Sequence, residues 1–406
     1  RIVEVGKVGQ VKIPAGATVI DTKGKTVIPG LIDAHAHGSQ GSNQIIPRQN
    51  WIQYSNLAFG VTTIHDPSNN TAEIFSAAEM QRAGLIVAPR IYSTGTIIYG
   101  AESLGAKAII NNYEDAEFHL QRMKDSGAIS VKSYNQPGRA QRQQIIQAAK
   151  KLGIMVVPEG GGKFHQNLTM LVDGHTGLEH SLPIAKGYSD LNQLWAATKF
   201  GYTPTFIVSY GGLMGEEYFY DRTEVWKNPR LLRYTPHEIL DSRSIRRPTA
   251  PDEQYNHFEV AKYAKTLNDK GVSVHIGAHG QREGLGAHWE LWIMQQGGFS
   301  PWQALRSGTI QGAEYIGMDK DIGSIEVGKL ADMVVIDGDL LKDLRRSEYV
   351  KYTILNGRVY EAATMNELGG KTKRQPFYFE GENQMVMPAE TRRELEEKAE
   401  KNHWVH

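Results

Sequence analysis

Short apolar runs alternate with helix-like segments through the middle of the chain, and this alternation limits the fold more than any other feature. Eight runs follow one another between Gly30 and His279: "GLIDAHAH", "GVTTIHD", "PRIYSTG", "AISVKSYN", "GIMVVPE", "TGLEHS", "YTPTFIVS" and "GVSVHIGAH". Segments such as "PGRAQRQQIIQAAKKL" lie between them, with apolar residues at helical spacing. Strands that alternate with helices form parallel sheets, and eight such units close into a barrel. We therefore predict an α/β fold, a (β/α)8 TIM barrel.

The two ends of the chain share another pattern, of short alternating runs broken by Gly and Asp, which predicts one small β-sandwich domain formed by both ends. Residue 1 falls in mid-pattern, with no initiator methionine or signal peptide before it, so we expect a longer parent protein. The predicted divisions are an incomplete N-terminal part of the sandwich (1–27), the barrel (28–318), the C-terminal part of the sandwich (319–365), and a tail with an exposed helix and an end that docks on another chain (366–406).

Composition restricts the partners. The 406 residues carry 45 basic and 45 acidic side chains, and no long basic run suggests nucleic acid. No apolar stretch reaches the roughly 18 residues of a membrane-spanning helix. The absence of cysteine removes disulfides, thiolate ligands and a cysteine nucleophile. We expect a small-molecule or short-peptide substrate.

Ionisable side chains lie where the predicted strands end. His35 and His37 are two residues apart on an extended chain, so both imidazoles face one way and form half of a metal site, unless they are merely half-buried strand histidines. Other strands end in polar residues: Asp66, Lys132, Glu159, His180 and His279. In a closed barrel these ends form the catalytic face.

One connection is unusually long. Residues 210–256 are crowded with aromatic residues and with charges of both signs. An insertion of this length is usually a lid or a substrate-binding element, although a segment that only packs or meets another subunit is an equal alternative.

The motifs "VIPGLIDAHAH", "GVTTIHD", "ISVKSYN", "GLEHS" and "GSIEVGKLADMVVID" together resemble the amidohydrolase superfamily of metal-dependent hydrolases. The similarity runs from about Val19 to Glu361 and is greatest to the imidazolonepropionase-like and prolidase-like branch, particularly the versions fused to a TolB-like β-propeller. The resemblance implies a barrel with one or two divalent ions, zinc being the expected ion. It also suggests an upstream propeller and export, for instance to the periplasm.

The resemblance assigns roles to strand-end residues. In similar enzymes the lysine at the position of Lys132 is carboxylated by CO₂ and bridges two metals, and His180 is the next ligand. The alternatives are a buried Lys132 paired with Glu159, and a core histidine at 180 whose ring is satisfied by backbone groups.

Two positions depart from the family pattern. The family usually has a histidine at the end of the fifth strand and an aspartate at the end of the eighth, where this chain has Glu159 and His279. The exchange keeps the total of imidazoles and carboxylates, so we predict Glu159 as a metal ligand and His279 as the catalytic base or a ligand of the other metal. His165 is an alternative fifth-strand ligand.

Three further residues are predicted to contact substrate. Tyr134 shares the face of Lys132 and could bind a carboxylate, although it could equally only pack. Arg282 and His288 follow the eighth strand in a Gly-rich segment.

The sequence predicts a metal-dependent hydrolase that cleaves a C–N bond in a peptide-like or N-acyl amino acid substrate. One alternative is hydrolysis or deamination of a cyclic imide or imidazolone-like compound. Another is an inactive barrel that serves as a binding or assembly module, and a homo-oligomer is compatible with each.

Overall fold

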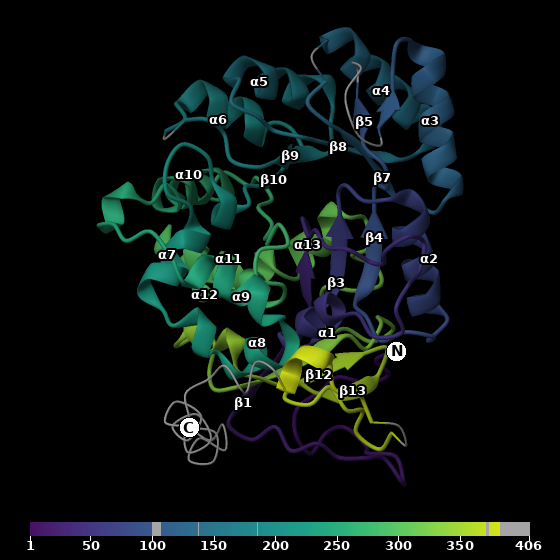
Figure 1. The fold of residues 1–406 in the computed structure, drawn as a ribbon, viewed down its shortest axis with the longest axis vertical. Helices are drawn as coiled ribbons and strands as arrows, with labels where there is room; N and C mark the ends of the chain where they lie inside the picture. Colours follow the sequence, from purple (N-terminus) through teal and green to yellow (C-terminus); the bar gives the residue numbers. More distant parts are fainter. Residues whose placement is uncertain (100–106, 137, 185, 371–372, 382–406) are drawn as a thin grey trace.

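A computed structural model describes residues 1–99, 107–136, 138–184, 186–370 and 373–381. Its parallel strands occur at seven of the eight predicted runs: β2 (Leu31–Asp33), β3 (Val61–Asp66), β4 (Arg90–Ser93), β7 (Ser130–Ser133), β8 (Met155–Pro158), β9 (Gly177–Glu179) and β10 (Gly201–Thr203). A short parallel pair adds β5 (Ile98–Tyr99) and β6 (Ala108–Ile109). The helices that connect and cover the strands are α1 (Trp51–Ala58), α2 (Thr71–Arg82), α3 (Tyr113–Asp125), α4 (Arg139–Leu152), α5 (Phe164–Asp173), α6 (Ser189–Ala196), α10 (His257–Asn268) and α11 (Leu285–Gln296) (Figure 1).

The strands follow the order of a (β/α)8 barrel, but their ladder is interrupted. Three separate parallel groups form, β2-β3-β4, β6-β5-β7-β8 and β9-β10. A bridge between Glu159 and Glu179 joins β8 to β9. The eighth predicted strand contributes a single bridge, Val274 to Tyr202, and its Ile276 carbonyl accepts the Ala34 amide at 3.1 Å. These contacts link the last segment to both β10 and β2, although the described residues do not form one continuous closed sheet.

Local sequence explains where the helices begin and end. Asn50, Asn70 and Asn112 each cap a helix by accepting a backbone amide through the side chain. Helix α4 ends at Gly153, whose φ of 66° is the left-handed conformation that glycine adopts at low cost. Such stops leave short turns between helix and strand, which hold the strand ends in place.

The two chain ends meet in one antiparallel sheet at the lower end of Figure 1. Its strands run in the order β1 (Lys25–Pro29), β11 (Met333–Asp337), β12 (Val350–Leu355) and β13 (Arg358–Glu361). The sheet packs on the barrel through Thr353, whose hydroxyl donates to the Leu57 carbonyl at 2.6 Å. The two ends therefore associate as predicted. The sandwich is not confirmed, because the described residues 1–24 contain no strand that could form a second layer.

The long insertion at 210–256 is folded rather than loop-like. It contains α7 (Gly215–Arg222), η2 (Val225–Lys227), α8 (Pro229–Tyr234), α9 (His237–Ser244) and η3 (Asp252–Gln254). Phe219 of α7 stacks on Trp289 of α11 with ring centroids 4.9 Å apart, and the Arg230 guanidinium donates to the carbonyls of Glu348 and Val350. The insertion thus packs against both the barrel and the small sheet.

The remaining described elements are η1 (Phe206–Val208), α12 (Pro301–Ser307), α13 (Ile310–Tyr315) and η4 (Leu344–Glu348). Within the described part of the chain, no helix has the length and apolar character needed to span a membrane. The helix predicted for the tail lies outside the described residues, which end at 381.

Candidate metal centre

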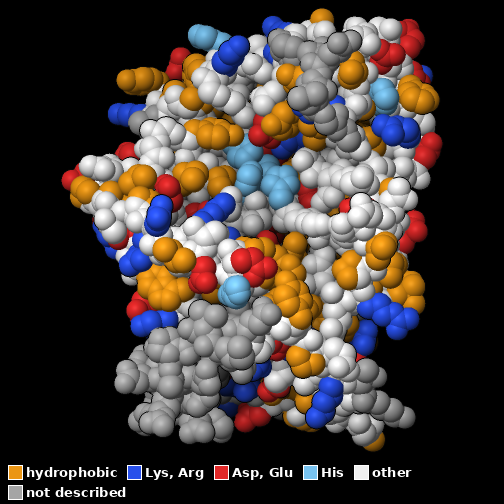
Figure 2. All heavy atoms as spheres, viewed as in Figure 1, with side chains coloured by type: hydrophobic (Ala, Val, Ile, Leu, Met, Phe, Trp, Pro, Cys, Tyr) orange, Lys and Arg blue, Asp and Glu red, His pale blue; other side chains and the backbone are white. Residues whose placement is uncertain are grey.

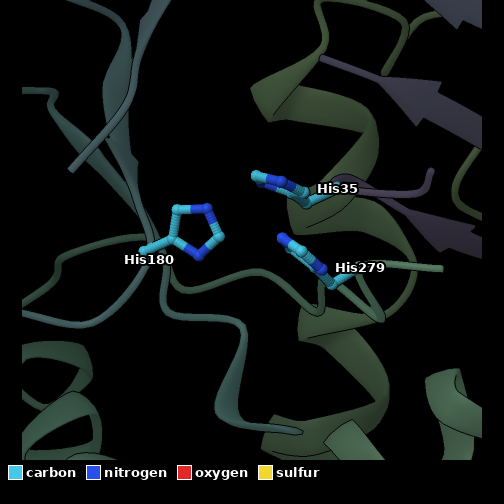
Figure 3. A group of neighbouring side chains, drawn as sticks. All are labelled: His35, His180 and His279. Atoms are coloured by element: carbon cyan, nitrogen blue, oxygen red, sulfur yellow. The ribbon is translucent and has the colours of Figure 1, made fainter. Parts of the chain in front are cut away.

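The residues predicted to hold a metal gather at one end of the parallel strands. They follow or end β2, β7, β8, β9 and the eighth segment: His35, His37, Lys132, Glu159, His180 and His279. The rings of three are neighbours, with centroid separations of 4.8 Å for His35–His180, 5.1 Å for His35–His279 and 5.0 Å for His180–His279. Figure 3 shows His180 on one side and His35 and His279 on the other, facing a shared space. Histidine side chains also reach the surface at the centre of the face in Figure 2.

The separation of the ring nitrogens suits a metal ion. One nitrogen from each of His35, His180 and His279 lies within 4.8 Å of the other two. Zinc binds imidazole nitrogen at roughly 2.0–2.1 Å, so two ligands of a tetrahedral site lie about 3.3 Å apart. The rings would turn inward to reach that spacing.

Hydrogen bonds on the outer side of each ring direct a lone pair inward. The Nδ1 of His35 bonds the Glu179 carboxylate, and the Nδ1 of His37 lies 3.2 Å from Asp66 Oδ1. Because a carboxylate accepts hydrogen bonds, both Nδ1 atoms carry the proton and both Nε2 atoms carry a lone pair. Yet the two Nε2 atoms face each other at 3.1 Å. Two lone pairs at that distance repel unless a cation lies between or beside them.

The same reasoning applies to His180. Its Nδ1 lies 2.8 Å from the Thr205 hydroxyl, which donates its own proton to the Pro204 carbonyl and therefore accepts from the ring. The Nε2 lone pair of His180 then faces Glu159 Oε1 at 3.1 Å, again an arrangement that requires a positive charge. The Nδ1 of His279 is buried and has no hydrogen-bond partner. The donor set thus fits a divalent cation.

Lys132 is the positively charged residue at this centre. Its ammonium lies 2.6 Å from Glu159 Oε2, so Glu159 contacts both Lys132 and His180. Burial opposes ionisation of Glu159, but the Lys132 ammonium outweighs that effect and holds the pKa of Glu159 below the ordinary value. Burial and the charge on Lys132 lower the pKa of His35, and burial also lowers the pKa of His180. The imidazoles are therefore neutral and available as ligands at pH 7.

Backbone geometry fixes two of the histidines. His180 has a φ of 72° and His279 a φ of 57°, left-handed conformations that are uncommon for residues other than glycine and that concentrate at functional sites. Asp33 lies beneath them, and its Oδ1 accepts the amides of His35 at 3.1 Å and Ala278 at 3.0 Å. One carboxylate thereby ties the start of the barrel to the segment that carries His279.

Comparisons with known proteins agree with this geometry. A family model described as "Amidohydrolase family" matches residues 235–360. This part of the chain is therefore similar to the amidohydrolase family. A dihydroorotase of Geobacter sulfurreducens is 26% identical over 165 residues, which are 38% of this chain and 35% of that protein. A 5'-deoxyadenosine deaminase of Methanobrevibacter smithii is 60% identical over 35 residues, which are 9% of this chain and 8% of that protein. The chain therefore spans about a third of the first relative and under a tenth of the second.

The solved structure of a Xaa-Pro dipeptidase with bound methionine has the same fold. It aligns with a TM-score of 0.65 at 20% identity and covers 89% of this chain and 93% of its own. The family match and this shared fold both agree with the predicted resemblance to the amidohydrolase superfamily.

Both residues that depart from the amidohydrolase pattern face the centre. Glu159 contacts Lys132 and His180, and His279 lies among the other histidine rings. The alternative fifth-strand residue, His165, is exposed in the first turn of α5 and stands beside Phe164, outside the set of histidines that could hold an ion.

The three predicted substrate contacts differ in location. Tyr134 is half-buried at the end of β7, with its ring 6.3 Å from Tyr99 and the Lys107 ammonium 5.9 Å above it. Arg282 is buried and turned toward the insertion, where it donates to the Ile239 carbonyl at 3.2 Å and lies 3.7 Å from Glu216.

His288 has a packing role instead of the predicted substrate contact. Its side chain is fully buried, its Nδ1 lies 3.0 Å from the Ser347 hydroxyl, and its Nε2 lies 2.8 Å from the Phe59 carbonyl. Both ring nitrogens are therefore used to join α11 to its neighbours. The position of His288 in the sequence, just beyond a predicted strand, could not reveal that its side chain points into the core.

Sequence reasoning missed Glu179, which orients His35. Its other oxygen accepts the Tyr315 hydroxyl, and burial raises the pKa of Glu179 to about 7. Strand alternation places Glu179 and His180 on opposite faces. The left-handed φ of His180 breaks that alternation, so both side chains serve one centre.

Proposed function

We propose that the chain is a metal-dependent amidohydrolase that cleaves a C–N bond in a peptide-like or N-acyl amino acid substrate. The observation that supports this most directly is the convergence of ring nitrogens: one from each of His35, His180 and His279 lies within 4.8 Å of the others, and Nε2 of His37 lies 3.1 Å from Nε2 of His35. When bound, a divalent ion, which we expect to be zinc, lowers the pKa of water toward 7 and polarises a carbonyl oxygen.

The residues of this chain then have distinct tasks. His35, His37, His180 and His279 would hold one or two ions, while Glu179, Asp66 and Thr205 keep three of the rings in the required tautomer. Glu159 would bind beside them.

Lys132 is proposed to change chemical form with metal loading. As an ammonium it forms an ion pair with Glu159. Reaction of the neutral amine with CO₂ forms an N–C bond and releases one proton, which turns the side chain into an anion. That anion would bridge two ions and free Glu159 to act as a ligand. A single ion requires no such change.

His279 has two possible roles in this proposal. Its place among the histidines that could hold an ion supports a ligand, and its unpartnered Nδ1 supports a group that accepts a proton from the attacking water. The base role requires one ring nitrogen to remain free of metal.

The test combines metal analysis with a substrate panel. Purified protein should contain one or two divalent ions per chain by inductively coupled plasma mass spectrometry, and chelation should abolish hydrolysis of dipeptides and N-acyl amino acids. Faster turnover of cyclic imides would favour the alternative activity. Full activity after complete metal removal would contradict the proposal, and metal without turnover of any compound would favour a binding module.

A further inference from the structure

The segment that follows His180 connects the candidate metal centre to an apolar groove. Leu182, Pro183 and Ile184 line a hollow of about 300 Å³, and Tyr210 lies on its other side. The Tyr210 ring is 5.5 Å from the His180 ring, so this hollow begins beside the histidines. Val260 of α10 completes an apolar wall.

A second hollow lies beside the first. It has a volume of about 370 Å³ and shares Ile184 with its neighbour. Its walls come from α5 and α6 and include Phe164, Leu168, Leu191 and Leu194. Figure 2 shows hydrophobic side chains beside the central histidines on the side toward α5 and α6. Together the two hollows have the size of an ordinary small-molecule site.

The lining indicates what could occupy the groove. Leu194 remains 40% exposed and Tyr188, at the rim, 73% exposed, so apolar surface faces water beside the centre. The charged side chains of the two hollows are Lys186, Asp190 and Glu259, whose net single negative charge disfavours an anionic group in the part of the ligand that lies there. If the histidines hold the bond that is cleaved, an apolar group attached to that bond would cover Leu194 and Tyr188.

We propose that the groove binds the apolar acyl part of the substrate, so that the preferred substrates carry an aromatic or long aliphatic acyl group rather than an acetyl group. The acyl carbon would lie at the metal centre, and its chain would pass Tyr210 and Ile184 toward Leu194. This inference rests on the proposed function, since it takes the histidine centre as the place of cleavage.

Two matched pairs of compounds test the proposal. The first pair, N-(3-phenylpropanoyl)glycine and N-acetylglycine, reports hydrolysis by the protein as purified. The second pair, N-(3-phenylpropyl)glycine and N-ethylglycine, has no amide to cleave and reports binding by calorimetry. The larger member of each pair should be preferred on the order of 10-fold or more, as expected for burial of several apolar carbons.

Leu194→Glu should remove that preference because it places a carboxylate in the groove. Leu194 is partly exposed, so the change should leave the fold intact. Leu194→Ala should reduce the preference less. The control is Leu85→Glu, the same replacement at a position 65% exposed and outside both hollows, which should retain the preference.

Equal binding of both amines, or an unchanged preference in Leu194→Glu, would overturn the inference. If no amide is hydrolysed but the larger amine still binds better and loses that advantage in Leu194→Glu, the proposed function fails while the groove assignment stands.

Discussion

Two groups of histidines in this protein differ in how their ring nitrogens are used. At the metal centre, His35, His37 and His180 each donate Nδ1–H outward and leave Nε2 without a proton. In the body of the barrel, His65 lies against Ala34 and Ser130, His275 against Thr203 and Ser273, and His288 against Ser347 and Phe59, so both nitrogens of each ring have partners.

Burial lowers the pKa of His35 and His180 at the centre, and it also lowers the pKa of the packing histidines, to about 4 for His65 and about 3 for His275 and His288. A depressed pKa therefore does not distinguish a ligand from a packing histidine here. The grouping of the rings does, because an ion needs several ring lone pairs that face one space, as at this centre, and not one isolated unpartnered nitrogen such as Nε2 of His175.

The largest expected effect comes from replacing one histidine of each group by another residue. His180→Ala should reduce metal affinity by more than the roughly 10- to 100-fold loss typical of an outer partner, and hydrolysis should fall with it. His288→Gln should keep its metal content while lowering the unfolding midpoint. Metal analysis and thermal melts of both variants separate the two results. His165→Ala, at an exposed position outside the cluster, is the control and should change neither quantity. Full metal content in His180→Ala would remove the distinction between the groups.

The second prediction concerns the exchanged pair, Glu159 and His279. Glu159→His or His279→Asp alone should lower activity on the order of 10²- to 10⁴-fold if the residue moves the proton. The double variant restores the usual superfamily arrangement and should recover part of the metal binding that each single change loses, since residues in one network are not additive. Metal affinity measured across the four proteins tests this. Normal hydrolysis by both single variants would show that neither residue acts in the reaction.

Glu179 provides a smaller test of the same comparison. Glu179→Gln weakens the hydrogen bond that keeps the proton on His35 Nδ1, so metal affinity should fall about 10- to 100-fold. Tyr315→Phe removes only the hydroxyl that donates to Glu179, and its effect should be smaller. Competition with a metal-binding dye measures both affinities. A greater loss of metal affinity in Tyr315→Phe than in Glu179→Gln would contradict the proposal that Tyr315 acts on His35 through Glu179.

The sequence predicted the centre better than its surroundings. Strand periodicity placed His35 and His37 on one face, and strand ends located Lys132, Glu159 and His180. Periodicity could not identify Glu179, because the left-handed φ that turns both Glu179 and His180 inward is a feature of the fold.

Long-range packing set the other limits. The helical insertion at 210–256 depends on contacts with Trp289 and with the small sheet, and the burial of His288 depends on Ser347, 59 residues away. Pairing of the chain ends was predictable from alternation, whereas the second sandwich layer is not confirmed.

The smallest effect expected is the pH dependence of a packing histidine. With a folded pKa of about 3, His288 stays neutral at pH values where the unfolded chain, with an ordinary histidine pKa near 6.5, takes up a proton. The unfolded state then binds more protons, so this residue makes the protein less stable as pH falls from about 6.5 toward 3, by about 1.4 kcal/mol per pH unit.

His288→Gln cannot titrate and lacks this dependence. At pH 7 the variant should be the less stable protein, because it loses hydrogen-bond partners that Ser347 and Phe59 supply. Toward pH 5 the difference from the parent chain should shrink, by less between pH 7 and 6 than between pH 6 and 5, because only the parent chain must keep a histidine ring neutral at this position. Urea unfolding at pH 7, 6 and 5 measures the difference directly. Stability curves that run parallel for the two proteins would mean that the His288 ring takes up a proton in the folded protein. The contact with the Phe59 carbonyl would then have to stabilise the protonated ring. The division between packing and ligand histidines would in that case need another basis.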